Sequence, residues 1–573
     1  MKNVALVGIG PHAKRIYLNY FKKHKINLAL VVDLDSQKNS IRKYLDENGF
    51  KNTKIFTIDD SYKDDEHLPE NIASNFLAVC KTFEITHLII STEPKAHFMY
   101  LEFALKNNIN VLTDKPITVT KNMTSLSSIE KIRKQYYQIL DLAKHSKGTC
   151  KVMCQRQYHR GYEKIKEVLT DAVNEYKMPI TNIEIFHSDG AWEMPHDLGK
   201  ENHPYKYGYG KLFHSGYHFI DLLSDFIKIN DSLGGNKKIV DGDVYSKVFT
   251  PNDEMNILNI EDYKRLFKDQ NIPAYYNENT NPTFNKYGEK DYHGLLTFYN
   301  KDGFTITTAS LNLLHNGVSR RSWIETKDFY KSNGRIRHER INIEIGHLLN
   351  IQVHSYQSKE ISDRTDNEES VGGLEHYDIY FFNNPLVDKE PFKEIHLGDM
   401  YSNKEKKEFL GYNELSREIF LTNFLNNKDC KGDIRDQALA IEILYSCAKG
   451  IHNYYNHKNK VEKIKVRNEY TYRFIAKRLK QYSTSTTRNL KKENIQNSIH
   501  YNDIYKLYNY IKYINKNNNY EVYISIDDTT NVAGSLLYKT FKYKFMAILY
   551  YRYLEYVITH KKISYLERLI ENL

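Results

Sequence analysis

An alternation of short apolar runs with amphipathic segments over the first 150 residues is the feature that most constrains the fold of this chain. The apolar runs lie at residues 4–7, 28–32, 55–58, 87–90 and 110–112. Between them, apolar side chains recur at helical spacing, as in residues 69–83 and 98–105. Strands this apolar have no face left for water, so the pattern predicts a parallel sheet covered by helices on both sides. Ligands of such sheets bind beyond the carboxyl ends of the strands.

A glycine-rich loop follows the first predicted strand. It consists of Gly8, Ile9, Gly10, Pro11, His12 and Ala13. The first glycine permits a tight turn, the second lets the backbone approach a pyrophosphate, and the small residue at position 13 allows close packing of helix on strand. A plain structural turn is the alternative, but the strand before the loop and the helix after it favour a dinucleotide site.

Asp33 ends the second predicted strand, 23 residues after Gly10. An acid at this place is expected to accept hydrogen bonds from the adenosine ribose hydroxyls, and it would repel a 2′-phosphate. We therefore expect NAD as the cofactor. Lys38 and Arg42 lie close by in the sequence, so NADP is not excluded.

Two further polar segments follow strands on the same predicted edge of the sheet, Thr92-Glu93-Pro94-Lys95-Ala96-His97 and Thr113-Asp114-Lys115-Pro116. A lysine held between an acid and a proline at a ligand-binding edge differs from an ordinary solvated lysine. Its ammonium group can hydrogen-bond a substrate hydroxyl and tune proton transfer.

Together these segments resemble the Gfo/Idh/MocA family of NAD(P)-dependent oxidoreductases, which includes glucose-fructose oxidoreductase and inositol dehydrogenase. The run 110–116 is similar to the family's Glu-Lys-Pro signature with Asp for Glu, and residues 210–223 resemble its glycine-led helix with a catalytic histidine, here His218. The resemblance implies a Rossmann dinucleotide-binding domain. It also implies that the cofactor is contacted by Thr92, Pro94, His97, Asp114, Lys115 and Gln155, besides the glycine loop and Asp33.

The chain departs from the family at His214. Inositol dehydrogenase-like members carry an Asp four residues before the catalytic histidine, where this chain has His214. His214 and His218 would share one face of a helix, and we interpret them with Lys115 as proton-transfer groups. A zinc pair is conceivable, but the sequence offers no evident third ligand, so no metal is predicted. A purely structural role for His214 stays open.

The middle of the chain alternates polar and apolar residues at 183–187, 295–299, 305–311, 341–345 and 377–382, with an Asp-Gly turn at 302–303. This pattern predicts a mainly antiparallel sheet, suited to forming one wall of a substrate pocket. The resemblance implies that the sheet is open and that its outer face supports a homo-oligomer. Residues 187–209, which include Trp192, His196 and His203, are rich in groups suited to polyols, although a solvated loop has the same composition. Helices are expected at 411–426 and 433–455.

The last segment carries the basic character of the chain. Residues 456–573 hold 22 Lys+Arg against 10 Asp+Glu, a net charge of +12, whereas the whole chain carries +10. Helical spacing of Tyr501, Tyr505, Tyr508 and Ile511, and a pattern over 549–573, predict a helical extension. It is expected to pack on the enzyme or a partner, with nucleic acid or an anionic membrane surface as the less favoured alternative.

The sequence thus predicts an α/β protein with a Rossmann domain at 1–150, an α+β substrate and oligomerisation domain at 151–455, and a basic, Tyr-rich helical extension at 456–573. Five scattered cysteines, a start without the pattern of a secretion signal and the lack of a long apolar run favour a cytoplasmic location without a membrane span. The favoured function is hydride transfer between nicotinamide and a secondary alcohol or ketone of a sugar, sugar derivative or cyclitol. The alternative is an inactive nucleotide-binding sensor that engages a partner through the basic segment.

Overall fold

The computed structural model describes residues 2–190, 198, 204–266, 284, 287–315, 336–358, 377–402, 405, 412–428 and 430–466, and the strands at 497–500, 510–516, 519–525 and 535–541. The chain forms two compact units, Met1–Val466 and Arg467–Leu573. The predicted residues Trp192, His196 and His203, and the predicted helix at 549–573, lie outside the described residues. Among those that are described, no helix is both long enough and apolar enough to cross a membrane.

The first sheet has six parallel strands in the order β3-β2-β1-β4-β5-β6, which confirms the predicted architecture. Its strands are β1 (Asn3–Val7), β2 (Asn27–Leu34), β3 (Lys54–Ile58), β4 (Ile85–Ile90), β5 (Asn110–Thr113) and β6 (Cys150–Val152). The strand order reverses between β1 and β4, and this reversal opens a crevice at the carboxyl ends of the two strands. The glycine loop after β1 and the segment after β4 both lie at that crevice.

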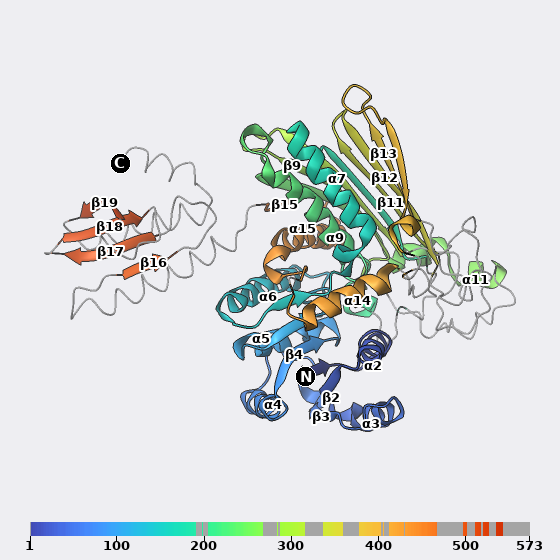
Figure 1. Cartoon of the computed structure of the whole chain (residues 1–573), viewed down its shortest axis with the longest axis vertical. Helices are drawn as coiled ribbons and strands as arrows, with labels where there is room; N and C mark the ends of the chain where they lie inside the picture. Colours follow the sequence, from blue (N-terminus) through green and yellow to red (C-terminus); the bar gives the residue numbers. More distant parts are fainter. Residues whose placement is uncertain are drawn as a thin grey trace. The chain divides into compact units, whose positions relative to one another are not determined.

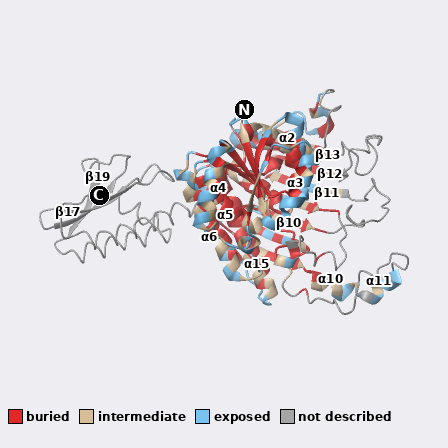
Figure 2. Cartoon of the chain, turned by 90° about the horizontal axis from the view of Figure 1, so that it is seen from below, coloured by how far each residue is buried: buried red, intermediate tan, exposed pale blue. Residues whose placement is uncertain are grey.

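Helices cover this sheet on both faces (Figure 1). They are α1 (Pro11–Ala13), a π-helical turn (Lys14–Leu18) and α2 (Asn19–His24) in direct succession, then α3 (Lys38–Glu47), α4 (Glu70–Thr82), α5 (His97–Lys106) and α6 (Leu126–His145). Their apolar faces leave the central strands buried, as the red interior of Figure 2 shows. After β6 the chain turns into a 3-10 helix (Gln155–Tyr158), so Gln155 and Arg156 stand just past the strand rather than within it.

The second sheet has nine strands in the order β14-β13-β12-β11-β7-β10-β9-β8-β15. They are β7 (Asn182–Ser188), β8 (Asp241–Phe249), β9 (Asp291–Tyr299), β10 (Thr305–Leu314), β11 (Ile336–Ile345), β12 (Leu349–Ser358), β13 (Tyr377–Asn383), β14 (Phe392–His396) and β15 (Glu462–Ile464). All pairs are antiparallel except β7 with β10. This confirms the predicted mainly antiparallel sheet. Strand β15 also shows that the first unit extends to Val466, beyond the boundary predicted at 455.

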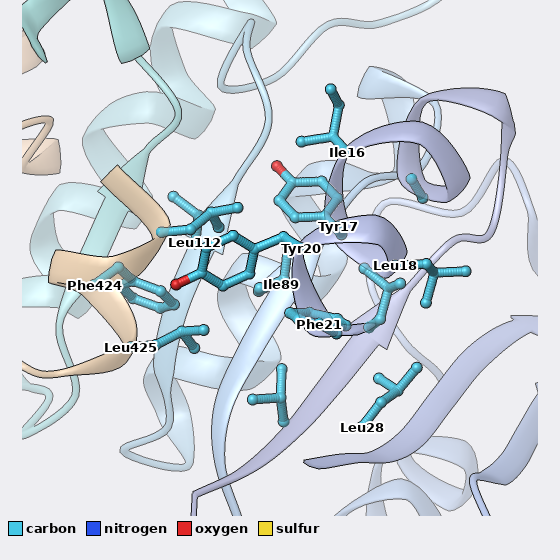
Figure 3. Packing of buried hydrophobic residues seen from close by; sticks show 14 of the residues in the cluster. Ile16, Tyr17, Leu18, Tyr20, Phe21, Leu28, Ile89, Leu112, Phe424 and Leu425 are labelled. Carbon is cyan, nitrogen blue, oxygen red and sulfur yellow. The ribbon is translucent and has the colours of Figure 1, made fainter. Parts of the chain in front are cut away.

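The remaining helices of the first unit are α7 (Arg160–Tyr176), α9 (Tyr217–Ile229), α10 (Pro251–Ile257), α11 (Ile260–Leu266), α14 (Tyr412–Leu425) and α15 (Ala438–Tyr455). Helix α14 returns from the second sheet to the first domain, where Phe424 and Leu425 pack beside Tyr20, Ile89 and Leu112 (Figure 3). The core of the first domain therefore contains side chains separated by more than 400 positions in the sequence. This closure fixes α14 beside the crevice.

The second unit differs from the expectation of a helical extension. Its described part is a four-stranded antiparallel sheet of β16 (Asn497–His500), β17 (Tyr510–Lys516), β18 (Asn519–Ser525) and β19 (Ser535–Phe541). Ile511 lies in β17, so the helix predicted through this residue is wrong. Tyr and β-branched residues at period two, as in Tyr-Glu-Val-Tyr-Ile, favour strands more strongly than the sparse tyrosine spacing favours a helix. Binding of nucleic acid by this segment stays a prediction.

Candidate active site

The glycine loop combines a tight left-handed turn at Gly8 with open space at Gly10. Gly8 has φ +86°, and its N–H donates to the carbonyl oxygen of Val32 at 2.8 Å. A Cβ on Gly8 would lie 2.7 Å from the carbonyl oxygen of Ser91, so no larger residue fits there without a shift of the backbone. A Cβ on Gly10 would meet nothing within 4 Å. The space above Gly10, at the start of the helical run 11–24, is therefore open to a phosphate that accepts from free helix N–H groups.

Asp33 anchors this loop. One carboxylate oxygen accepts from the N–H of Ile9 at 2.8 Å, and the other accepts from the N–H of Leu34 at 2.8 Å. Burial raises the pKa of Asp33, while these two bonds act in the opposite direction. Because each carboxylate oxygen can accept a second hydrogen bond, the site retains acceptor capacity for ribose hydroxyls.

A cleft of about 240 Å³ opens at the ends of β4 and β5. It is lined by His12, Ser91, Thr92, Glu93, Pro94, His97, Asp114, Lys115, Pro116, Met153, Gln155, Tyr209, His214, His218 and Arg417. Nine of these are residues that the sequence predicts for the site: His12, Thr92, Pro94, His97, Asp114, Lys115, Gln155, His214 and His218. The predicted residues Gly8, Ile9, Gly10, Pro11, Ala13 and Asp33 form or anchor the adjacent loop and do not line the cleft.

Asp114 is held by donors that the sequence did not reveal. Its carboxylate accepts from the Tyr17 hydroxyl at 2.5 Å and from the Ser91 hydroxyl at 2.6 Å, and His12 Nε2 lies 3.7 Å away. Tyr17 is fully buried on the helical run after the glycine loop. Asp114 thus connects that run to the ends of β4 and β5.

Lys115 reaches across the cleft. Its Nζ donates to the backbone carbonyl oxygen of His214 at 2.6 Å. Burial lowers the pKa of Lys115 to about 8, although the carboxylates of Asp114 and Asp189 oppose the shift. A lysine with such a pKa exchanges a proton near neutrality, which suits general acid–base work.

His218 stands in the first turn of α9 and is buried at the cleft. Burial and then the charge of Lys115 hold its pKa well below the usual range, so the ring is neutral. Its Nε2 lies 3.4 Å from the amide nitrogen of Gln155, which makes Nε2 the acceptor and places the ring proton on Nδ1. Among the described residues, Nδ1 has no hydrogen-bond partner.

His97 lies beneath the cleft floor and is fully buried. Its Nδ1 faces the carbonyl oxygen of Pro116 at 3.0 Å and its Nε2 faces that of Thr92 at 3.2 Å. Burial lowers its pKa, so the neutral ring donates to one carbonyl at a time. The ring therefore joins the two strand-end segments that form the cleft.

A buried polar network supports the side of the cleft formed by the second domain. Arg156 makes two hydrogen bonds to Glu339, at 2.9 and 2.6 Å, and Lys211 pairs with Asp189 at 2.7 Å. Burial alone would raise the pKa of Glu339, but the guanidinium of Arg156 outweighs it and holds the pKa far below its usual range. Ser215 donates to Asp189 at 2.7 Å, which secures the loop beside His214.

Three lining residues were missed by sequence reasoning, namely Ser91, Met153 and Arg417, whereas Tyr209 ends the predicted substrate segment 187–209. Arg417 belongs to α14, about 300 residues after Lys115, and nothing in the helical pattern of α14 singles it out. Met153 and Ser91 are an apolar and a small polar residue without a motif. Only the strand-end position of Ser91, directly after β4, carried a usable signal.

One known protein family matches the first domain. Residues 2–140 match the family model described as an oxidoreductase family with an NAD-binding Rossmann fold. No curated protein sequence matches the chain.

Solved structures with a similar fold include three dehydrogenases and oxidoreductases. The WlbA dehydrogenase from Bordetella pertussis, in complex with NADH and UDP-GlcNAcA, has 11% identity and a TM-score of 0.44, over 82% of this chain and 99% of that one. An oxidoreductase domain protein from Kribbella flavida has 12% identity and a TM-score of 0.46, over 81% and 100%. The apo scyllo-inositol dehydrogenase from Lactobacillus casei has 13% identity and a TM-score of 0.42, over 81% and 98%.

Proposed function

We propose that this chain, whose residues 2–140 match the model of an oxidoreductase family with an NAD-binding Rossmann fold, transfers a hydride between a nicotinamide cofactor and a secondary alcohol or ketone of a sugar, sugar derivative or cyclitol. The observation that carries the proposal is the meeting of Lys115, His218 and Gln155 in one cleft beside the glycine loop. The cofactor, when bound, supplies the redox chemistry, and the chain supplies orientation and proton management.

The residues that would hold the cofactor are the glycine loop and Asp33. The open space at Gly10 accommodates a pyrophosphate, and the spare lone pairs of Asp33 accommodate ribose hydroxyls. A carboxylate at this position favours NAD over NADP because it repels a 2′-phosphate. NADP remains compatible with the rest of the site.

Proton transfer is assigned to Lys115. In the oxidative direction its neutral amine accepts the proton of the substrate hydroxyl, and in the reductive direction its ammonium returns it. The low pKa of Lys115 makes both forms available near neutral pH. The Nδ1–H of His218 is suited to donate to the substrate oxygen, since Nε2 is occupied by Gln155.

The role proposed for His214 differs from the proton-transfer role of Lys115 and the hydrogen-bonding role of His218. Its backbone carbonyl holds the Lys115 ammonium, so the loop 210–216 orients the proton-transfer group through the main chain. Whether the imidazole of His214 also exchanges protons is tested by His214→Ala, which leaves the backbone carbonyl in place. An unchanged pH profile of kcat would limit His214 to the positioning of Lys115.

The decisive experiment is a titration of the protein with NADH, followed by absorbance at the nicotinamide band with a panel of sugars, sugar nucleotides and cyclitols. We expect NADH to bind and at least one panel member to be turned over, with turnover lost in Lys115→Met. NADH binding without turnover of any member, in both wild type and Lys115→Met, would favour a cofactor-binding sensor instead.

We also propose that the open face of the second sheet joins two copies of the chain. Leu295 on β9 and Phe392 on β14 are 65% and 52% exposed, so each offers an apolar contact to a second copy. Sedimentation of the wild type and of Leu295→Lys would test this. We expect a dimer or larger assembly that dissociates in the variant.

A further inference from the structure

The cleft contains a permanent positive charge that transfer of a proton and a hydride to a neutral polyol does not require. Arg417 lines the same cleft as Lys115 and His218, and its side chain is 14% exposed. A guanidinium stays charged at any physiological pH, and its planar fork matches the two oxygens of a carboxylate or phosphate. Such a group in a largely desolvated cleft indicates an anionic ligand.

The fold holds Arg417 firmly in this position. It lies on α14 one turn before Phe420 and Leu421, which are buried in the core of the first domain. Figure 1 shows α14 between the sheet of the second domain and the first domain. The arginine is therefore carried by a rigid element rather than by a loop.

Arg417 belongs to a cluster in which cations outnumber carboxylates. Its Nη1 donates to Glu414 at 3.1 Å. Burial would raise the pKa of Glu414, but the charges of Arg417, Arg337 and Arg15 together hold it below its usual value. The guanidinium groups of Arg417 and Arg337 thus act on one carboxylate, which leaves an excess of one positive charge among these three residues.

Two further cations of this region have carboxylates of their own. The Lys115 ammonium has the Asp114 carboxylate near it, and Lys211 is paired with Asp189. Burial lowers the pKa of Arg337, as expected for a cation whose surroundings compensate it incompletely. Within the described part of the chain, no carboxylate lies within ion-pair distance of Arg337.

The location of Arg337 places its charge on the second-domain side of the cleft. Arg337 is the second residue of β11, and the next residue, His338, pairs with Ser188 at the end of β7. This is the end of the second sheet that carries Asp189 and supports the loop beside His214. The cofactor loop, in contrast, belongs to the first domain.

We propose that the substrate of this cleft bears an anionic group, a carboxylate or a phosphate, and that Arg417 binds it with the charge of Arg337 in support. The inference rests on the proposed function, because it places the anion beside the alcohol that Lys115 deprotonates. A neutral sugar or cyclitol would leave the excess positive charge beside Glu414 without a counter-ion and binds weakly. The substrate class is thereby narrowed to acidic or phosphorylated polyols.

The test compares three probes that share one sugar ring: D-glucuronate, D-glucose 6-phosphate and D-glucose. Each is titrated into the NADH-loaded protein, with nicotinamide fluorescence as the readout. We expect at least one anionic probe to bind more tightly than glucose, and the preference between glucuronate and the phosphate ester distinguishes the two anion types. Equal binding of all three probes, or tighter binding of glucose, would overturn the proposal.

Variants test whether Arg417 is the residue that binds the anionic group. Charge-assisted hydrogen bonds of this kind correspond to roughly tenfold to a hundredfold in affinity. We expect Arg417→Met to weaken the anionic probe by that factor and leave glucose unchanged, and Arg417→Lys to recover part of the loss. Arg265→Gln on α11, an exposed arginine paired with Asp262, is the control and should behave like the wild type. If Arg417→Met fails to fold, as judged by thermal unfolding, Arg337→Gln replaces it and should weaken the anionic probe in the same direction.

Arg417 could bind the pyrophosphate of the cofactor instead of an anionic group of the substrate. The NADH affinity of the variants distinguishes these two roles. If Arg417→Met weakens NADH as much as the anionic probe, the guanidinium serves the cofactor and the proposal fails. If the wild type does not bind NADH at all, the proposed oxidoreductase function fails instead. The two failures are therefore distinguishable in one set of titrations.

Discussion

The two glycines of the nucleotide loop provide a matched pair of substitutions with opposite expected effects. Gly8 has a positive φ and no room for a Cβ, whereas Gly10 has φ −76° and free space. Placing an L-residue at a left-handed position costs about 1–2 kcal/mol. Crowding a Cβ against the Ser91 backbone at 2.7 Å adds about 1–3 kcal/mol. We therefore expect Gly8→Ala to lower the free energy of unfolding by about 2–5 kcal/mol.

Gly10→Ala should act on binding rather than on folding. Its φ is compatible with alanine, so the unfolded chain loses entropy and the free energy of unfolding rises by up to about 1 kcal/mol. The new methyl group occupies the space where a pyrophosphate would approach the backbone. A tenfold loss of NADH affinity corresponds to about 1.4 kcal/mol, and we expect at least that.

Urea unfolding and NADH fluorescence titration measure the two effects separately. The expected result is a destabilised Gly8→Ala, and a Gly10→Ala that is stable but binds NADH weakly. Unchanged NADH affinity of Gly10→Ala would refute the assignment of this space to the pyrophosphate. Unchanged stability of Gly8→Ala would refute the steric argument for the turn.

Three further predictions concern charges. Burial lowers the pKa of Lys115 to about 8, so the neutral fraction of this lysine grows as pH rises through that value. We therefore expect kcat/KM for alcohol oxidation to rise over this pH range and kcat/KM for ketone reduction to fall. A flat pH–rate profile would contradict the assignment of proton transfer to Lys115. Arg156→Met removes one partner of the buried ion pair with Glu339 and should lower the free energy of unfolding in urea by about 3–5 kcal/mol. Arg160→Met removes one partner of the half-exposed pair with Glu405 and should lower it by at most about 1 kcal/mol. Similar losses for both variants would show that burial of the pair does not matter. Burial raises the pKa of Glu289 to about 7, so the stability that this residue contributes is complete below its usual pKa and declines as pH rises through 7. Glu289→Gln should therefore flatten the decline of protein stability between about pH 5 and about pH 8. An unaltered slope would exclude Glu289 as the source of the decline.

The elements of the first domain were predictable because their signals are local. A run such as Val4–Val7 is apolar and β-branched, the turn after it needs glycine, and the helix that follows shows its own periodicity. Each signal spans a few residues and requires no knowledge of the rest of the chain. The same locality made the predicted strand-end groups Asp114 and Lys115 visible in the sequence.

The C-terminal unit shows where local signals mislead. Tyrosines recur so often over residues 456–573 that some fall at helical spacing by composition alone, and the predicted helix through Ile511 rested on them. Strands β17 and β18 instead pair in register from Tyr510 with Ser525 to Lys516 with Asn519. Cross-strand pairing is a property of two segments, so neither segment reveals it alone.

The sequence by itself determined the glycine loop, the alternating fold of the first domain and the strand-end position of Lys115, since these depend on spacing within short segments. His218 was singled out only because residues 210–223 resemble a helix of the family. Tertiary structure alone decided that Tyr17 and Ser91 hold Asp114, that the backbone of His214 holds Lys115, and that Arg417 enters the cleft. The physical reason is that these contacts join residues from 23 to about 300 positions apart, and only the packing of α14 and of the second sheet on the first domain brings them together.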